Sequence, residues 1–428
     1  MKISQKAQKI NLNNLVDICT DVHKDELCFF FEIDGKEFSD SCRNLTKTIE
    51  KKLLAYKNIA KEHGKANLRI ICEPTGEYHN KLMRTARRLG CFTNLVSGEA
   101  VAKFRVIETN DYNKTDQKDP RVIATLGKLN KVIRYRILPE DYLMLRKLHK
   151  MYDDCDVYIT SIRCKISRLL VELFCDYSFK PDFIYSRSGQ SLMLNYDANP
   201  YRIVADSFAV FAKKMKKYAP RVQKRTLERL YEDAEQSVLN ELPRGYLGIL
   251  EDNLCNLMTD YQRILRRKEK IVGDMKAILQ RIRKNDPLIP PPTPAVISEK
   301  NLARLLAETG PLADFVSSKQ LMRYAGLNLR TRQSGKYQGQ NKISKKGRSL
   351  LRKVMNAIAL PLVRRSQLYG EYYHLKKEQT KMPGSKAMTI VARKLLAKIF
   401  GWYRSGKQFN ATRFFTCQSR YEELAKAA

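Results

Sequence analysis

Residues 15–33 read LVDICTDVHKDELCFFFEI, two apolar runs separated by three polar residues. This pattern predicts two β-strands, 15–22 and 26–33, joined as a hairpin. A turn at Asp34-Gly35 leads into a third strand through Phe38. Helices and strands then alternate: helix 44–63, strand 67–73, helix 77–89, strand 92–96 and a helix near residue 116. We therefore expect an α/β domain with helices on the faces of a sheet.

Acidic residues stand at the ends of these predicted elements. Asp21 ends the first strand and Glu73 ends the strand 67–73, while Asp116 and Asp119 lie three residues apart at a helix start and share a face. Taken singly, each could be a turn residue, a helix cap or a solvated charge. Crowded together, four carboxylates would repel one another unless hard cations such as Mg²⁺ or Mn²⁺ lay between them. Two such ions could clamp the oxygens of a phosphodiester displacement.

The charge of the chain points to a polyanionic partner. Its 428 residues include 80 Lys and Arg against 45 Asp and Glu, a net charge of +35 with a pI near 9.8. Nucleic acid is the natural partner, because neutralising phosphates releases counterions. Ten cysteines without a CxxC pair argue against zinc and for a reduced intracellular protein. No uninterrupted apolar run has the length of a membrane span, so we expect no membrane partner.

The middle of the chain, 131–290, carries two heptad seams, over residues 145–173 and 254–282. Lys268 interrupts the second seam, either to pin its register or to face a charged partner. Antiparallel pairing of the two helices would form a coiled-coil arm, within one chain or between two, and a local helical bundle remains equally open. Between the seams, residues 213–229 are strongly basic. They predict a helical insertion that faces nucleic acid or, alternatively, a solvated charged surface.

The last third is predicted to be mainly helical around one basic stretch. After the proline break at 290–294 we expect helices 299–308 and 319–325, the second capped by Ser317 with Gln320. From residue 330 to 353, nine of 24 residues are Lys or Arg and none is acidic. We expect phosphate contacts there from Arg330, Arg332, Lys336, Lys342, Lys345, Lys346, Arg348 and Arg352. Within this stretch the Ser334 hydroxyl could attack a phosphodiester or simply bind a phosphate.

Two sets of motifs resemble one family. Asp21-Val22-His23-Lys24-Asp25, the segment 72–78 (CEPTGEY) and the segment 114–119 (KTDQKD) resemble the DEDD domain of the IS110-family transposases. The segments 324–327 (YAGL), 333–336 (QSGK) and 343–352 (ISKKGRSLLR) resemble the C-terminal IS116/IS110/IS902 domain. Two departures stand out: Pro120 replaces the family's usual Ala, and IPPPTP at 289–294 replaces an Ile-Pro-Gly-Ile-Gly hairpin turn.

The resemblance implies a RuvC-like, ribonuclease-H type fold for the first domain. It also implies a metal-binding tetrad of Asp21, Glu73, Asp116 and Asp119, holding Mg²⁺ or Mn²⁺, and Ser334 as the nucleophile that joins covalently to DNA. Ser344 is the nearest rival. The resemblance further implies a structured guide RNA from the element. We also expect a homo-oligomer (dimer or tetramer) and a cytoplasmic, nucleoid-associated location.

The predicted organisation has four segments. These are a RuvC-like domain at 1–130, a helical coiled-coil linker with a basic insertion at 131–290, a serine-bearing domain at 291–410, and a tail at 411–428. We therefore expect an α/β plus α protein that acts as a transposase with a composite active site. The alternatives are a RuvC-like junction endonuclease that uses the carboxylates and water, and a non-catalytic protein that binds DNA or RNA.

Overall fold

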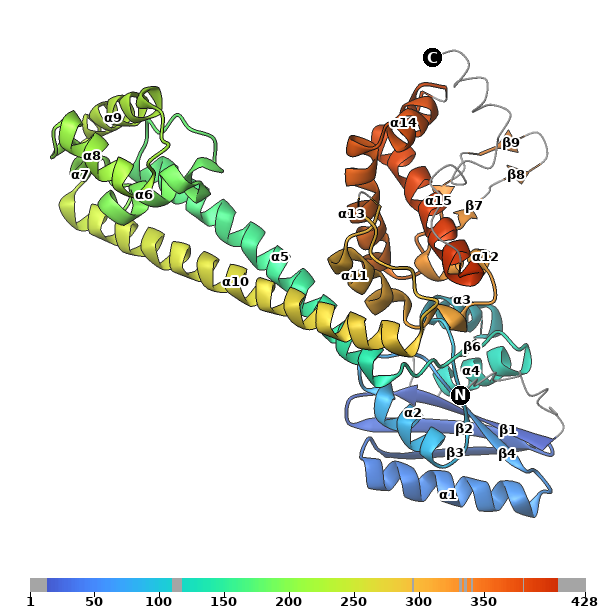
Figure 1. The fold of residues 1–428 in the computed structure, drawn as a ribbon. Helices are drawn as coiled ribbons and strands as arrows, with labels where there is room; N and C mark the ends of the chain where they lie inside the picture. Colours follow the sequence, from blue (N-terminus) through green and yellow to red (C-terminus); the bar gives the residue numbers. More distant parts are fainter. Residues whose placement is uncertain are drawn as a thin grey trace, which may run out of the picture. The chain divides into compact units, whose positions relative to one another are not determined.

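The structure, a computed structural model, describes most of the chain. The described residues are 14–109, 118–294, 296–330, 333–334, 337–339, 342–379 and 381–406. The chain divides into two compact units, Met1–Ile137 and Leu138–Ala428. The first is a mixed α/β unit and the second is mainly helical (Figure 1), which confirms the predicted fold class.

The first unit is built on a six-stranded sheet. Its strands are β1 (Leu15–Val22), β2 (Glu26–Ile33), β3 (Lys36–Arg43), β4 (Asn67–Cys72), β5 (Phe92–Leu95) and β6 (Ile133–Arg134), in the order β3-β2-β1-β4-β5-β6. The strands β1, β4 and β5 run parallel, and the other neighbours pair antiparallel. The long apolar runs of β1 and β2 are buried because helices cover the sheet on both faces.

Alternate residues of β1 and β4 pack against different helices. Ile18 and Ile70 belong to the core beneath α1 (Thr46–Glu62) and α2 (His79–Arg88). Cys19 and Ile71 belong to the core beneath α3 (Gly98–Thr109) and α4 (Lys118–Lys128). Helix α3 was absent from the predicted order of elements. Its sequence signal is a weak one, Ser97 followed by an acidic residue in the first helical turn.

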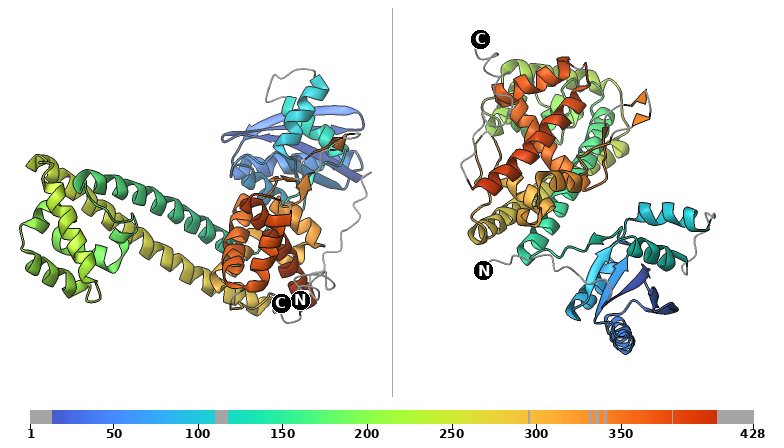
Figure 2. Two further views of the ribbon diagram at one scale, coloured as in Figure 1. Left: turned by 90° about the horizontal axis from the view of Figure 1, so that it is seen from above. Right: turned by 90° about the vertical axis from the view of Figure 1, so that its right-hand side faces the viewer.

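The second unit contains a long antiparallel helix pair. Helix α5 (Glu140–Leu173) packs along α10 (Arg244–Asn285), and the two helices run side by side in both figures (Figures 1 and 2). The seam closes within one chain, as one of the open alternatives expected. Lys268 forms an ion pair with Asp156 across the seam, and its ammonium lies 4.8 Å from the ring centroid of Tyr152. The charged partner expected for Lys268 is therefore on the facing helix.

Each end of the helix pair has its own apolar core. At the far end lie η2 (Phe183–Tyr185), α6 (Arg187–Tyr196), α7 (Pro200–Val204), α8 (Phe208–Tyr218) and α9 (Lys224–Val238). We call this end the arm tip. At the near end lie α11 (Glu299–Thr309), α12 (Ser318–Ala325), α13 (Ser349–Arg365), α14 (Gln367–Gln379) and α15 (Gly384–Ser405).

Short strands interrupt the near-end helices between α12 and α13. Strand β7 (Leu329–Arg330) pairs with β10 (Lys342–Ile343), and β8 (Gln333–Ser334) pairs with β9 (Tyr337–Gln338). Helix α12 begins as predicted, with the Ser317 hydroxyl accepting from the backbone N–H of Gln320 at 3.3 Å, and it ends at Gly326 in the left-handed conformation. Across the described part of the chain, every helix is too short or too polar to cross a membrane.

Candidate active site and nucleic-acid interface

The register of the central strands brings two of the predicted carboxylates together. Thr20 on β1 lies opposite Cys72 on β4 at the last paired position of this parallel ladder. Asp21 and Glu73 follow directly, so they leave neighbouring strands at one edge and on one face of the sheet. The pKa of the Cys72 thiol supports this proximity: burial raises it most, and both carboxylates raise it further.

Backbone donors and a glycine position these two acids. The side chain of Asp21 is 9% exposed, its Oδ1 accepts from the backbone N–H of Val22 at 2.8 Å, and its Oδ2 lies 3.2 Å from Nε2 of His23. Glu73 lies against the first residue of α3, Gly98, where any Cβ would collide with its carboxylate. A side chain at position 98 would therefore displace Glu73.

Asp119 lies in the first turn of α4, which packs on the same face of the sheet as Asp21. Its side chain is buried, and both Nε and Nη2 of Arg105 on α3 donate to its Oδ1, at 2.8 and 2.6 Å. Arg105 could not be predicted from sequence, because no spacing rule connects it to a carboxylate on the next helix. Asp116 lies outside the described residues, so the geometry of the complete tetrad does too.

The donor chemistry of these acids fits a hard divalent cation. Carboxylate oxygens are the ligands that Mg²⁺ and Mn²⁺ prefer, and Asp21 and Glu73 offer them side by side. Within the described residues, however, no group of three His, Cys, Asp or Glu side chains could hold a metal ion. Arg105 supplies positive charge beside Asp119.

Another acid on β1 has a structural role. Asp17 pairs with the buried guanidinium of Arg69, with 2.6 Å between Nε and Oδ1. Arg69 also donates from Nη2 to the carbonyl oxygen of Gly127 at 3.3 Å. This ion pair therefore ties the C-terminal part of α4 to the sheet. It fixes the helix whose first turn carries Asp119.

In the second unit, the structure places Ser334 in the short β8–β9 ladder. It pairs with Tyr337 and is exposed. In the β7–β10 ladder, Arg330 on β7 lies opposite Lys342 on β10, and both side chains are exposed. Like charges directly opposite each other destabilise a ladder, and a phosphate between them would relieve the repulsion.

The other residues expected to contact phosphate differ in their exposure and in their hydrogen-bond partners. Lys345 and Lys346 are exposed between β10 and α13, whereas Arg332 and Lys336 lie outside the described residues. Arg352 donates from Nη1 to the carbonyl oxygens of Ala325 at 3.0 Å and Gly347 at 3.1 Å. Arg352 therefore ties the segment between β10 and α13, residues 344–348, to the end of α12. We call this segment the basic loop.

The rival serine, Ser344, lies in the loop that follows β10 and is hydrogen-bonded through both its hydroxyl and its backbone. Its hydroxyl donates to Oδ1 of Asn328 at 2.6 Å, and its backbone N–H donates to the Asn328 carbonyl at 2.8 Å. Gly347 approaches the end of α12 so closely that a Cβ there would collide with the carbonyl oxygen of Tyr324. These contacts give Ser344 and its loop a structural function.

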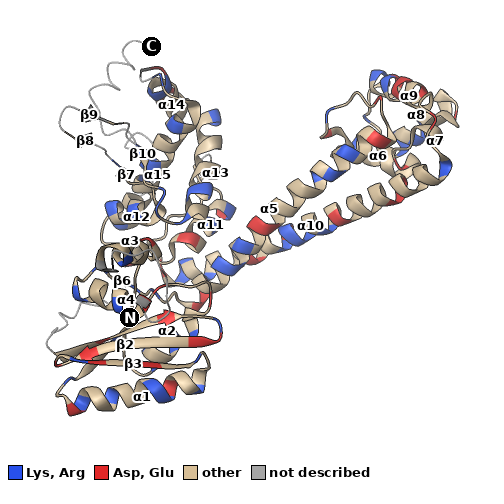
Figure 3. Cartoon of the chain, turned by 180° about the vertical axis from the view of Figure 1, so that it is seen from behind, with Lys and Arg blue, Asp and Glu red and all other residues tan. Residues whose placement is uncertain are grey.

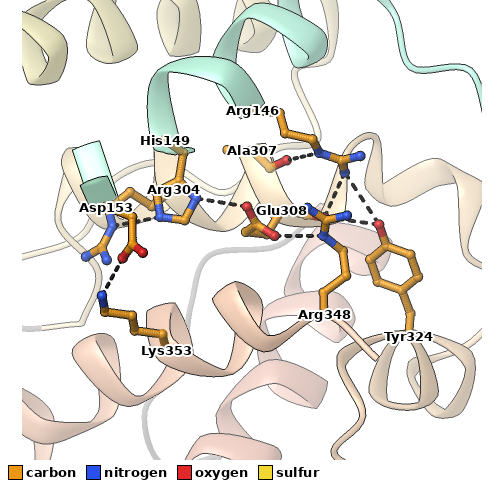
Figure 4. A network of polar contacts seen from close by, with 9 residues as sticks. All are labelled: Arg146, His149, Asp153, Arg304, Ala307, Glu308, Tyr324, Arg348 and Lys353. Atoms are coloured by element: carbon orange, nitrogen blue, oxygen red, sulfur yellow. Dashed lines mark hydrogen bonds and ion pairs between the residues drawn. The ribbon is translucent and has the colours of Figure 1, made fainter. Parts of the chain in front are cut away.

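A buried polar network joins α5 to α11, α12 and α13 (Figure 4). At its centre, Oε1 of Glu308 lies 2.9 Å from Nδ1 of His149, and Oε2 accepts from Nε of Arg348 at 2.7 Å. Arg304 donates to Nε2 of His149 at 3.3 Å, which assigns the proton of a neutral imidazole to Nδ1. Burial raises the pKa of Glu308, but the bonds from His149 and Arg348 outweigh it and lower this pKa to about 2.

The same network satisfies the end of helix α11. Arg146 on α5 donates to the carbonyl oxygens of Ala307 and Glu308, each at 2.9 Å, and the Tyr324 hydroxyl donates to the Glu308 carbonyl at 3.2 Å. Cations near a helix C-terminus also interact favourably with its dipole. The network was not predicted from sequence, and it gives Arg348 an internal partner beside the basic loop.

Comparison with known families agrees with the architecture. Residues 18–175 match the model of the DEDD-type IS110 family, described as Transposase, and residues 295–374 match the family described as Transposase IS116/IS110/IS902 family. A search of curated proteins gave no match. The DEDD match implies a RuvC-like fold for the sheet and a dependence on divalent metal. With both domains present in the family's order, the chain belongs to the IS110 family of transposases, enzymes that cut and rejoin DNA.

Proposed function

We propose that this transposase cuts and rejoins DNA through a covalent intermediate on Ser334. The observation that carries the proposal is the contrast between the two serines of the basic stretch: Ser334 is exposed, whereas Ser344 is bound to Asn328. In the step, a bond forms between Oγ of Ser334 and phosphorus while the bond from phosphorus to a sugar oxygen breaks. The serine proton is lost and the leaving oxygen takes one up. One phosphoester replaces another, so no nucleotide cofactor is consumed.

The acids of the first unit serve this chemistry from the edge of the sheet. Asp21, Glu73, Asp116 and Asp119 would hold Mg²⁺ or Mn²⁺, which stabilises charge on the phosphate and on the leaving oxygen when bound. Asp21 is oriented by a backbone donor and Glu73 by the close approach of Gly98. Asp119 is buried and held by Arg105. This support limits the freedom of the carboxylates before substrate arrives.

We infer a composite active site, because the proposed serine nucleophile and the carboxylates belong to separate compact units. We propose that it forms in a homo-oligomer, dimer or tetramer, at the DNA of a prokaryotic nucleoid. A structured RNA from the element would select target and donor DNA by base pairing. The net charge of +35 fits RNA as well as DNA, because both are polyanions.

The test is an adduct assay with purified protein, element-end DNA, its flanking RNA and Mg²⁺. Denaturing gels would resolve a covalent protein–DNA species, and Ser334→Ala and Ser344→Ala would be run as a matched pair. We expect the adduct to disappear with Ser334→Ala and to persist with Ser344→Ala. Omitting the RNA should abolish adduct formation at the correct site.

Other outcomes would replace the mechanism. Metal-dependent nicking by wild type and Ser334→Ala alike, without adduct, would identify a hydrolytic nuclease that uses water. An adduct lost only with Ser344→Ala would transfer the nucleophile to the rival serine. Cutting at one defined DNA sequence without the RNA would refute the proposal that the RNA selects the DNA.

A further inference from the structure

The arm tip carries a dense group of positive charges. Between residues 213 and 225 the chain has seven Lys and Arg and no acid. They follow one another across the end of α8, the connecting loop and the start of α9, as Lys213, Lys214, Lys216, Lys217, Arg221, Lys224 and Arg225. Lys and Arg also occur along the arm helices (Figure 3), where Asp and Glu are interspersed among them.

Internal partners account for only part of this group. Lys214 pairs with Asp206 at 2.7 Å, and Lys224 pairs with Glu228 at 3.2 Å. The remaining exposed cations without a carboxylate partner in the described chain include Lys213, Lys216, Arg221 and Arg225. Their charges are available to an external anion.

The helix dipoles of α8 and α9 also fail to explain this group of cations. Lys216 and Lys217 lie in the last turn of α8, where a helix dipole favours cations. Lys224 and Arg225 lie in the first turn of α9, where the dipole disfavours cations and no acid is present. The dipole of α9 therefore does not account for the cations at its start.

The arm places this surface far from the serine-bearing domain. Lys353 on α13 contacts α5 at Asp153, whereas the arm-tip core contacts α5 from Ile162 onward and has its outer end near Leu173. The helical rise makes this separation about 30 Å. That is close to one turn of B-form DNA, about 34 Å. A duplex that reaches both places must therefore extend about one turn beyond the serine-bearing domain.

We propose that residues 213–225 form a second DNA-binding surface, which holds the backbone of duplex DNA about one turn away from the serine-bearing domain. The contacts are with phosphates, because lysines and arginines on exposed helix ends provide charge without a groove-reading element. Binding at two separated surfaces makes affinity depend on duplex length, since a long duplex engages both at once.

The test compares the triple variant Lys213→Gln, Lys216→Gln, Arg225→Gln with wild type. A matched control removes the same charge from α1 by Lys47→Gln, Lys51→Gln and Lys61→Gln, which are exposed on a helix that covers the other face of the sheet from α4. Full-length proteins are titrated with labelled duplex DNA of about one turn and of about four turns, and with a four-turn RNA duplex. Salt dependence is measured for each.

For the long DNA duplex, we expect the tip variant to bind about tenfold more weakly than wild type, with a salt slope smaller by about 2 to 3. On the short duplex the difference should fall to about twofold, and the α1 variant should match wild type throughout. Unchanged binding by the tip variant, an equal loss in the α1 variant, or a loss confined to RNA would each overturn the proposal. Ser334→Ala should show the same dependence of DNA affinity on duplex length as wild type. A failure of the serine mechanism in the adduct assay is therefore distinguishable from a failure of this proposal.

Discussion

Glu308→Gln tests how strongly the buried network holds the near end of the arm. Glu308 is 1% exposed, and both of its carboxylate oxygens are engaged, by His149 and by Arg348. Glutamine keeps the shape but not the charge, and its amide group would point a donor at a donor. The guanidinium of Arg348 would lose its counterion in a poorly solvated place.

The pKa of Glu308 sets the magnitude. It is lowered from 4.5 to about 2, and each pKa unit corresponds to about 1.4 kcal/mol, so the network stabilises the folded state by about 3 kcal/mol at neutral pH. A lowered carboxyl pKa stabilises the fold above the unfolded value of 4.5. This contribution is lost as the pH falls from 4.5 towards 2. The cost of Glu308→Gln should therefore be constant between pH 6 and 8 and shrink below about pH 4.5.

Trp402 provides the readout. It is the only tryptophan of the chain, and it is buried in the same apolar core as the helices that the network joins. Urea unfolding followed by its fluorescence should show a loss of about 3 kcal/mol for Glu308→Gln at pH 7. The exposed Glu269→Gln on α10 should lose less than about 0.5 kcal/mol. A loss below about 1 kcal/mol at pH 7, or one that does not shrink in acid, would refute the electrostatic argument.

Three further predictions concern the seam, the basic loop and the metal. Lys268→Ala should lower the free energy of unfolding by about 1 kcal/mol in urea titrations, because a partly exposed ion pair and a ring contact are lost, whereas the exposed Lys270→Ala should not. Gly347→Ala should weaken DNA binding in fluorescence titrations because its Cβ forces the basic loop to move; Gly273→Ala, which meets no atom within 4 Å, should bind normally. Mg²⁺ should raise the melting temperature of wild type but not of Asp21→Asn in thermal scans; equal shifts would remove Asp21 from the metal site.

Local patterns were sufficient for the sheet and for part of the site. The strands 15–22 and 26–33 have the bounds predicted for them, because two mainly apolar runs and a polar turn leave few other solutions. Once β1 and β4 are neighbours, acids at both strand ends must meet, so Asp21 and Glu73 could be paired without a structure. The cap at Ser317 and the mismatch at Lys268 were also readable, since each depends on nearby sequence or on one seam.

Long-range polar contacts could not be predicted in this way. Arg105 finds Asp119 only because α3 and α4 pack side by side, and α3 itself begins with a weak signal. Glu308 ends a predicted helix like any solvated acid, yet it pairs with His149, 159 residues away. His149 lies outside the heptad positions counted for α5. Burial decides the role of both residues, and burial here depends on the whole near-end core.

The closed seam between α5 and α10 makes the arm a spacer whose length can change during evolution. Because both helices turn back at the tip, a seven-residue insertion in each would keep the heptad pairing and move the tip outward by about 10 Å. An insertion that is not a multiple of seven would break the heptad pairing and, at about 100° per residue, direct the tip cations away from their original side. Relatives that act on differently spaced DNA should therefore differ in arm length by matched multiples of seven.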